Sequence, residues 1–538
     1  MTGLNTTEEL MKTIKLFDTT LRDGSQSAGI SFSVDDMLRI AQSLDAFGIH
    51  YIEGGWPGSN PKHELFFKEA LKLKFKNARL VAFGSTRYKG NTAAADANLQ
   101  AIIRSKVKVA CIFGKTWDLH VLHALRTTPE ENLKMIADSV CFLKSKGLEV
   151  IYDAEHFFDG FKSNRDYALA TLRAAVDAGA DNVTLCETNG GMLPSGIQEI
   201  IRVVKKELPA AALGIHTHND TECAVANSIV AVQEGCTLVQ GTINGLGERC
   251  GNANLCSIIP ALQLKLGYRC IPDKKIVQLT ELSRYVDEVA NLLPNERQSY
   301  VGLNAFAHKA GIHVSAIERN SLTYEHIAPT AVGNERKILV SELSGKSNIA
   351  SKAKEFSLDI ENDPQAAAKI IDLVKKAEHN GYQFENADAS FNLLTRKALG
   401  IYTPFFTLKG FHVSVEKNAA GEMVSEATVK LDIKGTEVHT VAEGDGPVNA
   451  LDSCLRKALA KFYPEICEMS LRDFKVRVIN AGASTAARVR VLVESCDPQD
   501  TWGTIGVSEN IIEASWQALS DAVEYKLLKK KPAIRRKK

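Results

Sequence analysis

Residues 213–220 read LGIHTHND, a short apolar run that carries His216 and His218 two positions apart. Helix-length segments precede and follow this run, so the pattern predicts a strand between two helices. Side chains two residues apart leave a strand on the same face, and we expect both imidazoles to point into a core. Two polar rings on a core face require a chemical reason.

Seven similar runs accompany this one in the first half of the chain. A helix-length segment separates each pair, such as residues 34–48 or 131–147. This alternation is typical of an α/β fold, a (β/α)8 TIM barrel, whereas an open doubly wound sheet usually carries a GxGxxG turn that LFDTTLRDG lacks. The predicted strands are residues 14–20, 50–55, 79–85, 107–114, 148–155, 181–188, 213–219 and 238–245.

The remaining sequence predicts two further regions, so that three domains are expected. A catalytic TIM barrel covers residues 1–272, a region of helical linker subdomains covers 273–404, and a C-terminal α+β domain covers 405–538. In the last region, three alternating strands followed by a helix occur twice. This repetition indicates a pseudo-symmetric (βββα)2 arrangement.

Composition excludes several classes of protein. The net charge of +1 gives no general attraction to nucleic acid or membrane, and no apolar stretch is long enough to span a bilayer. The 11 cysteines form no CxxC pair, which favours reduced thiols. The first residues, MTGLNTTEELMK, do not resemble a signal peptide, so a cytoplasmic protein is expected.

Polar side chains that could bind a metal occur at the carboxyl ends of the predicted strands, where the active sites of such barrels lie. Asp23 follows the first strand, and Asn252 lies in the loop after the eighth. Because strands seven, eight and one are neighbours in a closed barrel, both residues can approach His216 and His218. Two imidazoles, a carboxylate and an amide oxygen suit a divalent ion. The alternative is a pair of core histidines that only form hydrogen bonds.

Four more polar residues end strands at this mouth. Arg22 adjoins the predicted metal site and suits a donor to an anionic or enolic oxygen, although a solvated loop cation is the alternative. Glu155 has apolar neighbours in the sequence, which predicts a raised pKa and a general base, or alternatively a satisfied core carboxylate. Arg87 and Thr188 end the third and sixth strands.

LFDTTLRDGSQ, IHTHND, NGLGERCGNANL and AFAHKAGIHVSAI resemble, in order and spacing, the acetyl-CoA-dependent 2-oxo-acid synthases, which include 2-isopropylmalate, homocitrate and citramalate synthases. EGGWPGSNPKHELFF and IYDAEHFFDGFK are most similar to citramalate synthases, and His156 and Glu187 depart from the isopropylmalate pattern. The resemblance implies an acyltransferase that makes (R)-citramalate from acetyl-CoA and pyruvate for isoleucine biosynthesis. The alternative is a 2-isopropylmalate synthase that uses 2-oxoisovalerate.

The resemblance also implies a divalent metal (Mn2+, Mg2+ or Zn2+), acetyl-CoA as co-substrate, a homodimer, and a C-terminal domain that dimerises and binds isoleucine as an allosteric inhibitor. The glycine-rich turns 443–447 and 480–485 are candidates for binding this effector through their backbone groups. The implied roles are metal binding by Asp23, His216, His218 and Asn252; substrate binding by Arg22 and Thr188; and catalysis by Arg22, Glu155 and, from the partner subunit, His313 and Tyr324.

Two other classes of function share parts of this pattern. Hydroxymethylglutaryl-CoA lyases share the DTTLRDG and HxHND motifs but lack a C-terminal βββα domain, and a binding protein on a barrel would not need Glu155 opposite the predicted metal site. Acceptor size depends on pocket volume, because one methylene is worth roughly 1–3 kcal/mol. Ile112, Phe113 and Tyr152, at the ends of strands four and five, are the expected pocket residues.

Overall fold

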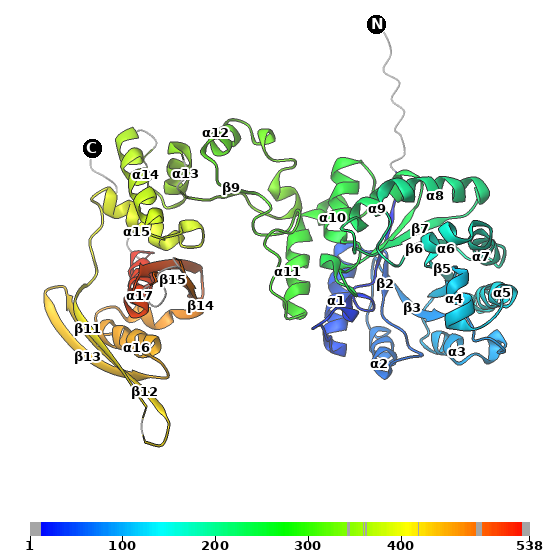
Figure 1. Ribbon diagram of the computed structural model, residues 1–538, viewed down its shortest axis with the longest axis horizontal. Coiled ribbons are helices and arrows are strands. Elements are labelled where there is room, and N and C mark those ends of the chain that lie inside the picture. The colour runs from blue at the N-terminus through cyan, green and yellow to red at the C-terminus, as the bar shows by residue number, and fades with distance from the viewer. Residues whose placement is uncertain are drawn as a thin grey trace, which may run out of the picture. The chain divides into compact units, whose positions relative to one another are not determined.

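The computed structural model describes residues 12–341, 345–358, 360, 363–417, 419–479 and 487–529 (Figure 1). The chain divides into two compact units. The first comprises Met1–Phe306 and Ile327–Glu335, and the second comprises Ala307–His326 and Arg336–Lys538. Every helix in the described part of the chain is too short or too polar to cross a membrane.

The first unit is a closed barrel of eight parallel strands, which confirms the predicted TIM barrel. Strand β8 pairs with β1 and closes the cylinder, and Figure 1 shows helices around the strands. The strands are β1 (Lys15–Asp18), β2 (Tyr51–Glu53), β3 (Arg79–Ser85), β4 (Val109–Lys115), β5 (Glu149–Glu155), β6 (Asn182–Glu187), β7 (Leu213–Thr217) and β8 (Leu238–Gly241).

Local signals set the limits of the surrounding helices. In α1, Ser33 and Asp36 form a capping box at the first turn, and Gly48 ends the helix in the left-handed conformation. The main helices of this unit are α1 (Val34–Phe47), α2 (Pro61–Ala70), α3 (Ala97–Arg104), α5 (Pro129–Ser145), α7 (Arg165–Asp177), α8 (Pro194–Glu207), α9 (Ala224–Gln233), α10 (Leu255–Pro260) and α11 (Leu279–Val289). Two shorter helices, α4 (Asp118–His120) and α6 (Phe157–Ser163), follow β4 and β5.

Alternate residues of each strand face the barrel interior. Phe113 joins the interior cluster, which includes its strand neighbours at 109 and 111. Ile112 and Tyr152 are cross-strand partners and belong to the core between barrel and helices. The Tyr152 side chain lies on the same side of the strand as Ile136 of α5. A Cβ added at Gly114 would meet atoms of both side chains, at 2.7 Å and 3.2 Å. The expectation that Ile112 and Tyr152 line the substrate pocket is therefore wrong, since both point away from the interior.

The second unit contains two three-stranded antiparallel sheets, each followed by a helix, which confirms the repeated βββα arrangement. The first repeat consists of β11 (Thr407–Lys417), β12 (Met423–Ile433), β13 (Thr436–Gly444) and α16 (Pro447–Leu459). The second consists of β14 (Ser470–Val478), β15 (Val489–Cys496), β16 (Thr501–Ser508) and α17 (Ile511–Lys529).

Helices that precede the first repeat pack against the second. Ser390 of α15 donates a hydrogen bond of 2.7 Å to Asp521 of α17, and its hydroxyl accepts one of 3.1 Å from the amide of Ile505. The linker region and the C-terminal repeats also share an apolar core, because Phe391 clusters with Ile505 and Val507. The domain limits at 272 and 404 stay predictions. The helices of this region are α12 (Gly311–Arg319), α13 (Lys346–Glu355), α14 (Pro364–His379) and α15 (Asp388–Ala398).

Candidate active site

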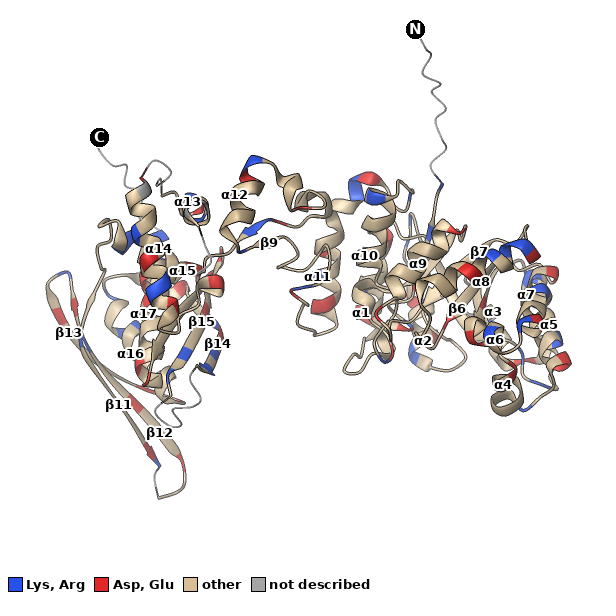
Figure 2. Ribbon diagram, turned by 45° about the horizontal axis from the view of Figure 1, so that its top comes forward, with Lys and Arg blue, Asp and Glu red and all other residues tan. Residues whose placement is uncertain are grey.

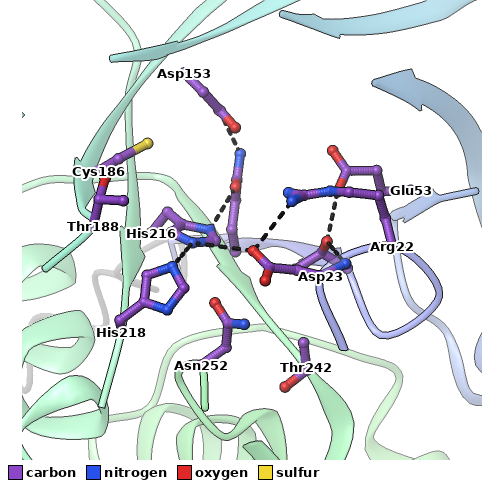
Figure 3. A network of polar contacts seen from close by, with 12 residues as sticks. Arg22, Asp23, Glu53, Asp153, Cys186, Thr188, His216, His218, Thr242 and Asn252 are labelled. Atoms are coloured by element: carbon purple, nitrogen blue, oxygen red, sulfur yellow. Dashed lines mark hydrogen bonds and ion pairs between the residues drawn. The ribbon is translucent and has the colours of Figure 1, made fainter. Parts of the chain in front are cut away.

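Asp23, His216 and His218 form a compact buried cluster at the carboxyl ends of β1 and β7 (Figure 3). The two Nε2 atoms lie 3.2 Å apart, and His216 Nε2 lies 3.7 Å from Asp23 Oδ2. Each of the three residues is at most 5% exposed. Two ligands of one ion, with bonds of about 2.1 Å, are roughly 3.0–3.4 Å apart, so the imidazole pair has a separation that suits a shared metal.

Asn252 adds an unsatisfied oxygen to this cluster. A β-bridge places Asn252 beside His218, and its amide nitrogen donates to the carbonyl of Leu246 at 3.3 Å. Its Oδ1 atom is buried and has no hydrogen-bond partner. Figure 3 shows this oxygen on the side of the Asp23 carboxylate and the His218 ring. Because a buried acceptor without a partner costs about 1–3 kcal/mol, a cation at this point would stabilise the arrangement.

The protonation states of the cluster also fit a cation. Burial lowers the pKa of His216, and burial together with the neighbouring His216 lowers the pKa of His218 to about 4. Burial alone would raise the pKa of Asp23, but the positive charge of Arg22 is the largest opposing cause, and the pKa lies below its ordinary value. Neutral imidazoles and an ionised carboxylate are the forms that bind metal ions.

Arg22 lies between two carboxylates and an aromatic ring. Its Nε atom donates to Glu53 Oε2 at 2.6 Å, and its Nη1 atom lies 3.3 Å from Asp23 Oδ2. The guanidinium carbon lies 3.9 Å from the centre of the Phe83 ring. Burial opposes the charge of Arg22, but Glu53 and Asp23 raise its pKa above the ordinary value. Arg22 is therefore a fixed cation beside the predicted metal ligands.

Three buried residues of this network were not predicted from the sequence. Glu53 accepts from both Arg22 and Thr19. Gln240 contacts His216 and Asp153 through its amide group. Asp153 and Gln240 lie inside β5 and β8, and Glu53 ends β2. Each is two residues after an interior residue of its strand, and this alternation is the signal that could have found them.

Glu155 and Thr188 lie at the ends of β5 and β6, as predicted. Glu155 forms an ion pair with Lys115, its cross-strand neighbour on β4, so the expectation of apolar surroundings for this carboxylate is wrong. The Thr188 hydroxyl accepts a hydrogen bond of 2.9 Å from the amide of His156, which has a left-handed φ of 57°. Arg249 donates to the carbonyl of Thr188 at 2.7 Å and steadies this loop.

Arg87 does not join the site. Its guanidinium forms ion pairs of 2.9 Å with Glu131 and 2.8 Å with Asp138, both on α5. Arg87 follows the end of β3, but two carboxylates of α5 hold its side chain on the helix layer, away from the barrel mouth.

Three family models match the chain. The HMGL-like family covers residues 13–286, the homocitrate synthase post-HMGL domain-like family covers 300–381, and the LeuA allosteric (dimerisation) domain covers 385–527. An (R)-citramalate synthase of Geobacter sulfurreducens is 57% identical over 96% of this chain and 98% of its own length. One of Aquifex aeolicus is 54% identical with the same coverage. This chain belongs to the citramalate synthase family.

More distant relatives separate the citramalate synthase family from its neighbours. A 2-isopropylmalate synthase of Methanocaldococcus jannaschii is 30% identical over 96% of this chain and 95% of its own length. The chain is thus an acetyl-CoA-dependent synthase whose sequence is much closer to the citramalate branch than to the isopropylmalate branch.

The remaining predicted site residues of this citramalate synthase family member lie in the second unit. Figure 2 colours the charged residues along the ribbon. The rings of His313 and Tyr324 stack with their centres 4.0 Å apart. Tyr324 is 46% exposed, whereas the following residue, Glu325, is buried. Glu325 accepts two hydrogen bonds of 2.6 Å from Arg336, and this ion pair anchors the segment that presents Tyr324.

Proposed function

We propose that this chain condenses acetyl-CoA with pyruvate and hydrolyses the product thioester to give (R)-citramalate and free CoA, a step that feeds isoleucine biosynthesis. The observation that carries the proposal is the buried Asp23–His216–His218 cluster beside Arg22, in a chain 57% identical to an (R)-citramalate synthase. A divalent ion (Mn2+, Mg2+ or Zn2+) held by these three residues and Asn252 would polarise the ketone of the 2-oxo acid.

Arg22 and Thr188 hold the carboxylate of pyruvate. Arg22 keeps its charge because Glu53 and Asp23 flank it. The Thr188 hydroxyl already accepts from the amide of His156, so its own proton is directed to another acceptor, such as a carboxylate oxygen. Both groups fix the orientation of the acceptor before the co-substrate reacts.

Glu155 removes a proton from the methyl group of acetyl-CoA. The resulting carbanion forms a carbon–carbon bond to the keto carbon of pyruvate, whose oxygen takes up a proton. Water then cleaves the thioester and releases the thiol of CoA. His313 and Tyr324, contributed by the partner subunit, assist these proton transfers, which makes a homodimer the active form.

Isoleucine is the proposed inhibitor, since it is the end product that citramalate would feed. The match of residues 385–527 to the LeuA allosteric (dimerisation) domain supports a regulatory role for the second unit. We place the effector at the β13–α16 turn, where Asn449 accepts from the amide of Asp445 at 3.1 Å. The second candidate turn, 480–485, lies outside the described residues.

Thiol release tests the proposed reaction. Purified chain with Mn2+ or Mg2+, acetyl-CoA and either pyruvate or 2-oxoisovalerate is followed with a thiol reagent. We expect faster release with pyruvate at equal concentrations. Faster release with 2-oxoisovalerate would replace the proposal with a 2-isopropylmalate synthase, and no release with either acceptor would exclude both.

A pair of glycine variants tests the effector site. A Cβ at Gly444 would lie 2.4 Å from the amide nitrogen of Ala450, so Gly444→Ala must shift the β13–α16 turn. A Cβ at Gly410, on β11 of the same sheet, meets nothing within 4 Å. We expect isoleucine to inhibit the natural chain and Gly410→Ala equally, and to require about 10-fold more for Gly444→Ala, a coupling loss within the usual range. Inhibition by leucine and not by isoleucine would contradict the named effector.

A further inference from the structure

A buried chain of hydrogen bonds leads from Asp153 through Gln240 to His216. Gln240, on β8, is completely buried, and Asp153 and His216 are 4% and 5% exposed. Gln240 Oε1 lies 3.0 Å from His216 Nδ1, and Gln240 Nε2 lies 2.8 Å from Asp153 Oδ1. Asp153 and His216, both labelled in Figure 3, belong to β5 and β7, so one glutamine links two strands across the barrel interior.

Two acceptors determine which way the Gln240 amide points. The Asp153 carboxylate accepts from the amide NH2 group. The Thr184 hydroxyl donates its proton to Asn182 Oδ1 at 3.0 Å, so it presents a lone pair to Gln240 Nε2 at 3.4 Å. With both acceptors on the side of Nε2, the carbonyl oxygen of Gln240 must face His216.

This direction fixes the tautomer of His216. A carbonyl oxygen can only accept, so Nδ1 of His216 carries the proton and Nε2 carries a lone pair. Nε2 is the atom that faces His218 Nε2 at 3.2 Å and Asp23 Oδ2 at 3.7 Å. Without Gln240, the proton could move to Nε2 and donate to either neighbour, and the lone pair needed for a metal would be lost.

We infer that Gln240 is a positioning residue that holds His216 in its metal-binding tautomer, and that Asp153 sets the direction of the Gln240 amide. The inference rests on the proposed function, because it assigns a purpose to the proposed metal site. Partners of this kind, which contact the second nitrogen of a metal-binding histidine, typically change metal affinity by about 10–100-fold when removed.

Three variants of the full chain separate positioning from packing. Gln240→Leu removes the acceptor at nearly constant volume. Asp153→Asn offers the amide a donor, which permits Gln240 to turn its NH2 group toward His216. The double variant Asp153→Asn with Gln240→Glu exchanges the two groups, so that the new amide at position 153 can donate to the new carboxylate at position 240, which again accepts from His216 Nδ1. A structural role alone would not predict recovery in the doubly changed chain.

The readout is Mn2+ binding to the metal-free chain, measured from the electron paramagnetic resonance signal of free Mn2+, with thermal unfolding recorded without metal. We expect each single variant to bind about 10–100-fold more weakly and the double variant to approach the natural chain. Natural affinity in Gln240→Leu, or a double variant as weak as the single ones, would overturn this inference and leave the proposed metal site intact. A natural chain that binds no Mn2+ would overturn both.

Discussion

At the residue scale, the carboxylates around Arg22 outnumber the single positive charge of its guanidinium. Asp23, Glu53 and Asp153 lie around one guanidinium, that of Arg22, and burial raises the pKa of Glu53 and raises that of Asp153 to about 7. The histidines stay neutral because burial lowers their pKa values. A site with this balance favours an added cation, and protons compete with it as the pH falls.

The first prediction separates metal ligands from the proposed base. His218→Ala should lose bound metal, whereas Glu155→Gln should keep it, because Glu155 pairs with Lys115 rather than with the cluster. Both variants should lose at least about 100-fold in turnover, since a general base contributes roughly 10²–10⁴-fold. Metal content per chain after gel filtration and thiol release provide the measurements. A metal-free Glu155→Gln chain would make Glu155 a ligand or a structural group.

The second prediction concerns a buried acid in the second unit. Glu524 is 3% exposed and accepts from the amide of Phe405, and burial raises its pKa to about 7. Its folded-state pKa thus exceeds the ordinary value of 4.5, so the stabilisation is complete below pH 4.5 and is lost as the pH rises through 7. Glu524→Gln imitates the protonated acid. We expect the variant to match the natural chain near pH 4 and to exceed it by on the order of 2–3 kcal/mol at pH 8.

Urea unfolding followed by tryptophan fluorescence measures this difference, because Trp502 and Trp516 both lie in the core of the second unit. Titrating groups that do not interact with Glu524 contribute equally to both proteins and cancel in the comparison. A stability difference that is the same at pH 4 and pH 8 would show that Glu524 does not titrate in this range.

At the element scale, β3 and β4 carry an aromatic wall beside Arg22. Phe83 and Phe113 stack with ring centres 5.4 Å apart, and Trp56 meets both edge-on. Since Arg22 lies over Phe83, this wall adjoins the proposed place of the pyruvate carboxylate. Bulky rings at this point leave room for a small acceptor.

The third prediction tests the wall. Phe113→Ala should raise kcat/KM for 2-oxobutyrate or 2-oxoisovalerate relative to pyruvate by about 10-fold or more, because each methylene that a pocket admits is worth roughly 10–200-fold. Ile112→Val is the matched control, since Ile112 precedes Phe113 but faces the helices. The control should lose about 1 kcal/mol of stability with an unchanged preference. An equal shift in both variants would show that packing, not the wall, controls acceptor size.

The same two residues show what the sequence could and could not predict. The strand positions could be predicted because apolar runs alternate with amphipathic helices. The HxH spacing likewise predicted that His216 and His218, at the end of β7, lie on one face. The sequence could not predict which residues of β4 face the interior, because both faces of a parallel barrel strand are buried and the segment 109–113 is apolar throughout. Glu53, Asp153 and Gln240 were missed for the related reason that one polar residue in such a run does not reveal its partner.

At the scale of the whole molecule, the proposed catalytic residues are divided between the two units. Asp23 and Glu155 belong to the barrel, whereas His313 and Tyr324 form a stacked pair in the second unit. Buried Glu325 pairs with Arg336 within that same unit, so the stacked pair has its own scaffold. Under the proposed function, the barrel would hold metal and substrate, and turnover would require His313 and Tyr324 of a second unit.

The last prediction asks which chain supplies that second unit. Glu155→Gln and His313→Ala are each expected to be inactive, and in chains that mix at random half of the dimers contain one of each. If the partner supplies His313, every mixed dimer has one intact site, and the mixture should recover about a quarter of the natural rate. The converse mixture combines the natural chain with a chain that carries both Glu155→Gln and His313→Ala. It should retain about a quarter of the rate if His313 acts on the partner's barrel and about half if His313 acts on its own. Thiol release from co-expressed, differently tagged chains measures both mixtures, and an inactive first mixture with a half-active second would place the complete site within one chain.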